Sequence, residues 1–189
     1  MRKPLVAFLL VMLAATGVMK SQTAGTGLTD VILKSYEPKM MTSKPVTDSQ
    51  VELVLKCGLK SPSARNRQPW KFTVVKDKAL LADIIPDFTP GNVLIIISGQ
   101  ESPPEGSNVD IDCALATAYM YIGAQSLGLG GHIYGGPVNN VNLNKRSILG
   151  IPEGYKAITL LRIGNVEGGV DAVSAASTRK SLEEIVNFR

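Results

Sequence analysis

The segment Ser61–Phe72 constrains the fold of this chain more than any other feature. It reads SPSARNRQPWKF, follows an apolar run typical of a helix at Val51–Leu59, and leads into alternating residues typical of a strand at Phe72–Val75. Pro62 and Pro69 fix φ near both ends, and the hydroxyl and amide groups between them form directional hydrogen bonds. The segment therefore predicts a helix-to-strand connection that can cradle a planar, hydrogen-bonding ligand. The alternative is a polar connector whose tryptophan merely covers the core.

Apolar periodicity and turn residues predict further helices and strands along the chain. The run Asn92–Ser98 is almost continuously β-branched, which is typical of a buried central strand. A helix is expected at Asp110–Leu129, and its body Cys113–Leu127 is apolar nearly all round, so this helix belongs either in the centre of the domain or at a dimer interface. Other helices are expected at 29–36, 47–59, 79–85 and 143–149 and within 177–189, and other strands at 71–76 and 155–163.

Residues 1–24 are interpreted as a signal peptide and leader, which places the protein in the periplasm as an exported protein. Arg2 and Lys3 precede the apolar run Pro4–Ala15, which is shorter than the roughly 20 residues that a membrane span needs. An uncleaved amphipathic or core helix is the alternative, and the cleavage site is not defined. Residues 25–189 then form a single domain.

The charge balance and the few cysteines exclude several classes of function. Three of the 20 basic residues lie in the leader, which leaves 17 against 16 acidic residues and no argument for nucleic acid or an anionic membrane as partner. Cys57 and Cys113 lie in apolar helical runs, which favours two buried free thiols over an oxidised pair. The lone histidine, His132, offers no metal site and is interpreted as a loop residue without a catalytic role. It lies in the glycine-rich segment Gly128–Gly136, which is expected to end the preceding helix in a turn.

The residues Pro62–Trp70 closely resemble the Pro-Ser-x-x-Asn-x-Gln-Pro-Trp signature of the nitroreductase family. Asp112 near the start of the long helix, the pattern from Ala124 to Gly130 at its end, and the run Leu160–Asn165 are also similar to that family. The resemblance implies an α+β fold of three layers, in which helices flank a central, mainly antiparallel sheet. It also implies an intertwined homodimer with flavin mononucleotide (FMN) at the interface.

The resemblance further implies which residues bind FMN. The family's Arg-x-Ser-x-Arg cluster for the flavin phosphate is missing, and lysine supplies a point charge without the planar fork of arginine. Phosphate-side candidates are therefore Lys34, Ser35 and Lys39 in place of that cluster, with Arg179 and Lys180 of the tail. Ring-side candidates are Pro62, Ser63, Ala64, Asn66 and Gln68, with Ile133, Tyr134, Gly135 and Gly136 lying against the ring.

The implied activity is hydride transfer from NAD(P)H through FMN to nitroaromatic or quinone-like acceptors. The flavin carries this chemistry, so no catalytic side chain is required. The alternative is an exported binding protein that keeps the fold with weak or lost flavin binding. A narrower option is a relative that uses flavin for dehalogenation or flavin breakdown. The sequence does not define the acceptor or the choice between NADH and NADPH.

Overall fold

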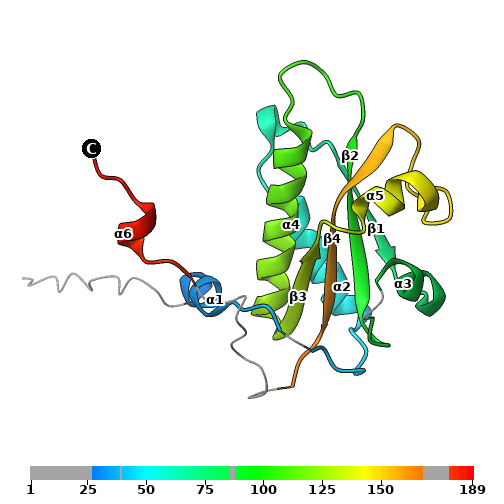
Figure 1. Cartoon of the computed structure of the whole chain (residues 1–189), viewed down its shortest axis with the longest axis horizontal. Coiled ribbons are helices and arrows are strands. Elements are labelled where there is room, and N and C mark those ends of the chain that lie inside the picture. The colour runs from blue at the N-terminus through cyan, green and yellow to red at the C-terminus, as the bar shows by residue number, and fades with distance from the viewer. Residues whose placement is uncertain (1–26, 39, 86–87, 168–178) are drawn as a thin grey trace, which may run out of the picture.

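The computed structural model describes residues 27–38, 40–85, 88–167 and 179–189, which form a sheet between layers of helices (Figure 1). Within these residues the sheet has four strands in the order β1-β2-β4-β3, and each neighbouring pair is antiparallel. The strands predicted at 71–76, 92–98 and 155–163 are confirmed, and the one at 92–98 is buried as expected. The strands are β1 (Trp70–Val75), β2 (Val93–Gln100), β3 (Leu129–Tyr134) and β4 (Tyr155–Asn165).

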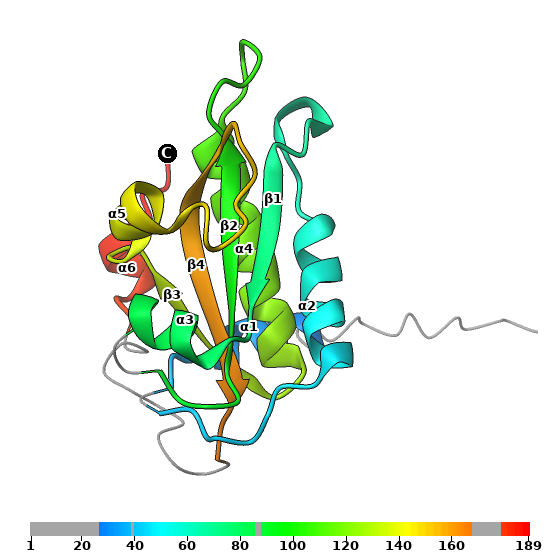
Figure 2. The same ribbon diagram turned by 90° about the vertical axis from the view of Figure 1, so that its right-hand side faces the viewer.

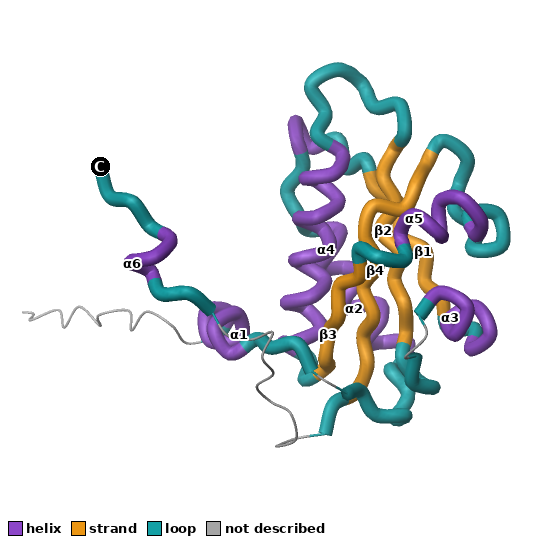
Figure 3. The backbone as a smooth tube through the Cα atoms, in the orientation of Figure 1, coloured by secondary structure: helices purple, strands orange, loops and turns teal. Residues whose placement is uncertain are grey.

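Helices cover both faces of the sheet (Figure 2). Figure 3 shows the same layers coloured by secondary structure. The predicted α+β architecture of three layers, with an antiparallel sheet at the centre, is confirmed. One face is covered by α2 (Asp48–Leu59) and α4 (Val109–Ser126), and α1 (Leu28–Lys34) packs against α4. The other face is covered by α3 (Lys78–Ile84), α5 (Val138–Asn140) and the π-helical turn η2 (Val141–Lys145). The short helix α6 (Leu182–Ile185) lies in the tail.

The alternation of side chains along β2 divides the hydrophobic core into two layers. Ile95 and Ile97 face α2 and α4, whereas Leu94 and Ile96 face α3 and η2. All four side chains are fully buried. Because successive residues of a strand point to opposite faces, a continuous apolar run is what a strand covered on both sides requires.

Glycines let α2 lie close against α4. A Cβ atom added at Gly58 would lie 2.7 Å from Met120, and one added at Gly123 would lie 2.7 Å from Sγ of Cys57. Both distances are too short for real side chains, so the contact depends on these two glycines. The prediction of two free thiols is confirmed, with Cys113 buried and Cys57 partly buried.

The segment expected as a turn after the long helix is instead strand β3, so that part of the prediction was wrong. Glycine is depleted in strands, but two glycines of β3 are required by its neighbours. A Cβ at Gly130 would lie 2.7 Å from Pro38, and a Cβ at Gly131 would lie 2.7 Å from the Tyr121 ring. Only Gly128, with φ +72°, has the helix-ending role that was expected.

The helix predicted at 143–149 was also wrong, because the helical turns of α5 and η2 occupy residues 138–145. The side chain of Asn142 explains this placement. Its Nδ2 donates a hydrogen bond to the Ala157 carbonyl oxygen at 2.9 Å, and its Oδ1 accepts one from the Ala157 N–H at 2.7 Å. This pair of bonds ties η2 to β4 and thereby fixes the position of the helical turns.

Some expectations fall on parts of the chain outside the described residues. The leader at 1–24 and Lys39 belong there, so the signal peptide and the phosphate-side role of Lys39 stay predictions. Among the helices that are described, none is long and apolar enough to cross a membrane.

Candidate flavin site

The signature loop, Pro62–Pro69, joins α2 to β1 and contains the short 3-10 turn η1 (Ala64–Asn66). Arg65, Asn66 and Gln68 have φ of 52°, 54° and 51°, which is the left-handed region. Such a conformation costs a residue other than glycine roughly 1–2 kcal/mol. Strain of this kind persists only where the surrounding contacts enforce it, and it concentrates at functional sites.

Hydrogen bonds within the loop join three of the predicted ring-side residues. The Gln68 N–H donates to Oγ of Ser63 at 3.0 Å. Nε2 of Gln68 donates to Oδ1 of Asn66 at 3.2 Å. The Asn66 side chain is exposed, and no hydrogen bond within the described residues engages its Nδ2. The loop therefore fixes the orientation of the Asn66 amide and leaves its donor group available to a ligand.

Hydrogen bonds from Arg67 anchor the signature loop to the loop at 101–108. Nη1 of Arg67 donates to the carbonyl oxygens of Pro104 at 3.0 Å and Glu105 at 2.8 Å, and it also contacts the Ser107 hydroxyl. The Gln100 N–H donates to the Pro69 carbonyl oxygen at 3.0 Å. Arg67 thus has a structural role, because these bonds join the signature loop to the loop at 101–108.

Trp70, at the end of the signature loop, belongs to the core. Its side chain is buried, and its ring stacks on Phe72 at a centroid distance of 6.2 Å. The alternative interpretation, in which the tryptophan covers the core, is therefore correct for the Trp70 side chain. It does not account for the exposed polar residues that precede it in the loop.

A second group of candidate residues gathers at β3, on the opposite edge of the sheet. The segment Tyr36–Pro38, here called the strap, lies across α4 and β3. The Tyr36 carbonyl oxygen accepts hydrogen bonds from the Tyr121 hydroxyl at 2.9 Å and from Nε2 of Gln125 at 3.0 Å. The carboxylate of the next residue, Glu37, contacts Nδ1 of His132. His132 lies in a strand, so the expectation of a loop histidine was wrong.

Tyr121 is partly buried in this region. Desolvation raises the pKa of the Tyr121 hydroxyl, and the negative charge of Glu37 raises it further, whereas Arg179 of the tail acts in the opposite direction. The phenol therefore stays protonated at neutral pH and can donate to the strap.

The phosphate-side candidates at the end of α1 have local structural roles. Lys34 forms an exposed ion pair with Asp30 at 3.8 Å. The Ser35 hydroxyl donates to the Ile32 carbonyl oxygen at 2.8 Å and so caps the helix. Arg179 and Lys180 are exposed. The strap brings the carboxylate of Glu37 to the β3 edge, where its negative charge would repel an anion.

The end of β3 leaves room for a flat ligand. Ile133 is 45% exposed, and Gly135 and Gly136 are exposed. A Cβ atom added at either glycine would have no other atom within 4 Å. Packing within the chain does not require glycine at these two positions, so the open backbone suits close approach by a planar ring. The residues present at both edges thus fit the ring of a flavin.

The structure does not bring the two groups together within one chain. The signature loop precedes β1, and the residues at 133–136 end β3, and these strands are the outer ones of the sheet. They are three strand spacings apart, about 14 Å at roughly 4.8 Å per spacing. A flavin that touches both groups would need either a second copy of the chain or a rearrangement.

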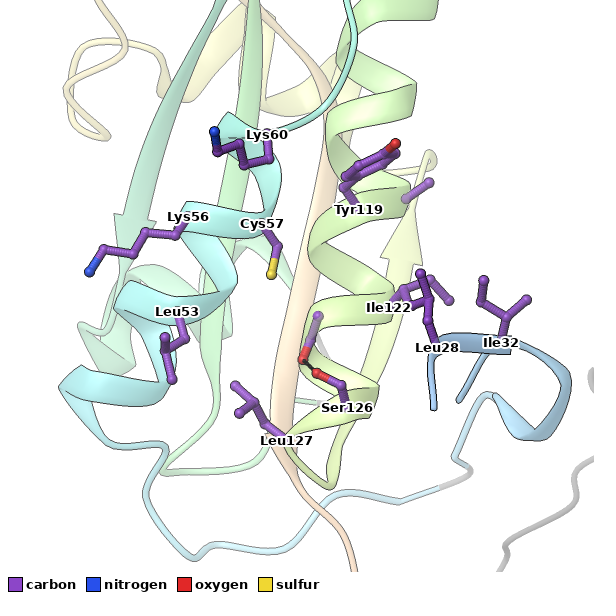
Figure 4. Close-up of a pocket in the computed structure, with 12 residues that line it drawn as sticks. Leu28, Ile32, Leu53, Lys56, Cys57, Lys60, Tyr119, Ile122, Ser126 and Leu127 are labelled. Atoms are coloured by element: carbon purple, nitrogen blue, oxygen red, sulfur yellow. Dashed lines mark hydrogen bonds between the residues drawn. The ribbon is translucent and has the colours of Figure 1, made fainter. Parts of the chain in front are cut away.

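An apolar groove of about 680 Å³ lies between α1, α2 and α4 (Figure 4). Leu28, Leu53 and Ile122 line it, and Lys56 and Lys60 stand at its side. Along the exposed face of α4, a stripe of large apolar side chains continues from the groove. Its members are Ile111, Leu115 and Tyr119, at 55%, 36% and 44% exposed.

Comparison with known structures identifies the fold. A nitroreductase of Bacteroides fragilis with bound FMN matches at a TM-score of 0.71 and 18% identity, over 86% of this chain and 98% of that one. A nitroreductase of Desulfitobacterium hafniense with bound FMN matches at 0.70 and 17% identity, over 86% and 98%. The chain has the nitroreductase fold.

Sequence comparison agrees with the assignment of the nitroreductase fold. The nitroreductase family model matches residues 39–94, which include the signature loop. A candidate NADH dehydrogenase/NAD(P)H nitroreductase of Archaeoglobus fulgidus is 29% identical over 135 residues, which are 67% of this chain and 78% of that protein. The predicted resemblance to the nitroreductase family is confirmed.

Several residues that shape the site escaped the sequence analysis. Asp112 was noted only as a residue at a helix start, yet its carboxylate bonds to the signature loop. Arg67 lies inside the signature, but nothing in the sequence connects it to the loop at 101–108. The sequence analysis did not single out Glu37, because its contact with His132 joins residues far apart in sequence.

Proposed function

We propose that this chain is an FMN-dependent oxidoreductase of the nitroreductase type, which passes a hydride from NAD(P)H to nitroaromatic or quinone-like acceptors. The observation that carries the proposal is the strained signature loop, in which Asn66 and Gln68 hold left-handed conformations. The loop presents an oriented, unengaged amide donor at an exposed position. The relatives with the same fold that were solved with bound FMN support the choice of cofactor.

The residues of this chain act by binding and orientation. FMN, when bound, supplies the hydride chemistry. Ser63, Asn66 and Gln68 would hold the polar edge of its ring, and the backbone at 133–136 would lie against the ring face. Arg179 and Lys180 would neutralise its phosphate, with Lys34 and Lys39 as further candidates. Transfer between two bound molecules needs no protein nucleophile, so the site works by holding donor and acceptor at the right distance.

We also propose that the working form is a homodimer in which the signature loop of one copy meets the β3 edge of the other. This arrangement would unite the two groups that one chain keeps apart. The apolar groove and the stripe on α4 supply surface to bury. The tail adds exposed apolar side chains for contact with a second copy, namely Leu182, Ile185 and Phe188.

Mixed dimers test this arrangement. Asn66→Ala removes the donor of the signature loop, and Gly135→Phe fills the open space at the end of β3. If each site takes one group from each copy, mixing the two defective variants restores one intact site in every mixed dimer. FMN binding then recovers to at most half of its normal level. If both groups came from the same chain, mixing would restore nothing.

The first test of the function is the visible spectrum of the purified protein before and after addition of FMN. We expect a perturbed flavin band that bleaches with NADH or NADPH and returns when a quinone or nitroaromatic is added. A spectrum of added FMN identical to that of free FMN would refute the proposal. The same titration with each nicotinamide would define the preferred reductant.

A binding protein that keeps the fold but has lost tight flavin binding is the second candidate. The carboxylate of Glu37 near the phosphate side favours it. Riboflavin separates the two possibilities, because it has the ring but no phosphate. Equal affinity for riboflavin and FMN would indicate a ring site without a phosphate site, and binding of neither would favour a different ligand.

Export to the periplasm remains part of the proposal. The apolar run Pro4–Ala15 after two basic residues motivates it. Fractionation of cells that produce the full chain should place a shortened protein in the periplasm. A full-length protein in the cytoplasm would instead favour an uncleaved helix.

A further inference from the structure

A buried carboxylate of α4 reaches the signature loop. Asp112 lies in the first turn of α4 and is 3% exposed. Its Oδ1 accepts a hydrogen bond from the Ala64 N–H at 3.0 Å, across 48 positions of sequence. Ala64 is the residue directly before the left-handed Arg65 and Asn66. The bond therefore holds the loop at the point where its backbone turns.

Stability alone does not explain a carboxylate at this position. The other oxygen of Asp112, Oδ2, is buried and has no hydrogen-bond partner among the described residues. Burial of a charged group is costly unless the group is fully paired. The start of a helix offsets part of this cost, because its dipole favours negative charge. An exposed acid in the same turn, such as Asp110, has that benefit without the cost of burial.

The other hydrogen bonds of the signature loop show which connection only Asp112 makes among those described. The Ser63 hydroxyl ties the loop to itself through the Gln68 N–H, and Arg67 ties it to the loop at 101–108. Neither bond connects the turn at Ala64 to the helical layer. Asp112 makes that connection, and a hydrogen bond to a charged acceptor is about twice as strong as one between neutral groups.

We propose that Asp112 is a positioning residue for the flavin site, which acts by fixing the left-handed turn that orients the Asn66 amide. The proposal rests on the proposed function, because that amide matters only if it meets a ligand. Asp112 does not touch the ligand itself. Its carboxylate acts through the backbone of Ala64, and loss of the bond lets Asn66 leave its strained conformation.

Amide hydrogen exchange of the full protein without flavin tests the mechanism directly. We expect Asp112→Ala to speed exchange at Ala64–Gln68 by about tenfold or more, since one charged hydrogen bond is lost. Asp112→Asn keeps an oxygen acceptor of the same size, so its effect should be smaller. Asp110→Ala is the matched control, because it removes an acid from the same turn without a bond to the loop.

FMN affinity provides the second measurement, followed by fluorescence of Trp70, the chain's single tryptophan. We expect affinity to fall about tenfold in Asp112→Ala, less in Asp112→Asn, and not at all in Asp110→Ala. A residue that only stabilised the fold would lower the melting temperature and speed exchange in β2 as well. Asp112→Asn serves if Asp112→Ala does not fold.

Two outcomes overturn the inference. One is wild-type exchange at Ala64–Gln68 in both Asp112 variants, and the other is faster exchange there with unchanged FMN affinity. A wild-type protein that binds no FMN would refute the proposed function instead, while the exchange measurement would still decide whether Asp112 holds the loop.

Discussion

The two edges of the sheet differ in how far their residues are prepared for a ligand. At the β1 edge, left-handed residues, an internal hydrogen-bond cluster and two outside anchors fix the signature loop. At the β3 edge, Tyr121 and Gln125 hold the strap by hydrogen bonds. The strap also carries Glu37, whose carboxylate contacts His132 and would repel the phosphate of a ligand. The comparison indicates that contacts within the chain orient the proposed ring-side residues more fully than the proposed phosphate-side residues.

Asn66→Ala should have the largest effect on binding. It removes the Nδ2 donor and the partner of Gln68, so a ring atom that needs this bond loses it. We expect FMN and riboflavin affinity to fall about 10- to 100-fold, since an unpaired buried polar group costs roughly 1–3 kcal/mol. Titration followed by Trp70 fluorescence measures the change.

Lys71→Ala is the control for this variant, because Lys71 is exposed and lies just beyond the signature loop. Its affinity for both flavins should match that of the wild type. If Asn66→Ala bound FMN as well as the wild type, the β1 edge would not be the ring site.

The next prediction compares a closely packed glycine of the glycine-rich segment, Gly131, with an open one, Gly135. Gly131→Ala places a Cβ atom 2.7 Å from the Tyr121 ring and so displaces the residue that holds the strap. Overpacking of this kind typically costs about 1–3 kcal/mol. Gly135→Ala enters open space and should change the free energy of unfolding by less than about 0.5 kcal/mol. Chemical denaturation of both variants measures the difference, and equal effects would contradict it.

The same contrast shows what could be predicted from the sequence. The signature loop, β1, β2 and the helices around them follow from local patterns, namely proline positions, apolar periodicity and helix-capping residues. Strand β3 could not be predicted, because the need for glycine at Gly130 and Gly131 comes from Pro38 and Tyr121, which are distant in sequence. The contact between Asp112 and Ala64 has the same origin. Local chemistry identified the candidate ring site, whereas its support depends on tertiary packing.

The buried thiol of Cys113 in α4 gives a prediction about pH dependence. Burial raises the pKa of the Cys113 thiol from 9.0 to about 12, and the negative charges of Asp110 and Asp112 contribute. The unfolded thiol loses its proton above about pH 9 while the folded one keeps it, so this residue's contribution to stability falls as pH rises from 9 to 12. The slope is at most about 1.4 kcal/mol per pH unit.

Denaturation at pH 8 and pH 10 should therefore show a steeper alkaline loss in the wild type than in Cys113→Ala. Cys57, which is partly exposed, provides a comparison, because its thiol should react with a thiol reagent well before that of Cys113. Identical pH slopes in the wild type and Cys113→Ala would contradict the assigned environment.

Glu37→Gln should have the smallest effect and addresses the phosphate side directly. The substitution removes a negative charge at the β3 edge and alters the contact with Nδ1 of His132, and both side chains are partly exposed. Charge effects at such positions are worth about 0.2–1 kcal/mol, so FMN affinity should rise by a few-fold at most. Riboflavin affinity should not change, because riboflavin carries no phosphate. A gain for both flavins would mean that Glu37 acts on the ring, and a loss for both would mean that the contact between Glu37 and His132 is needed to hold the strap. An unchanged FMN affinity would place the phosphate away from the strap, beside Arg179 and Lys180, and those two residues would then be the ones to substitute.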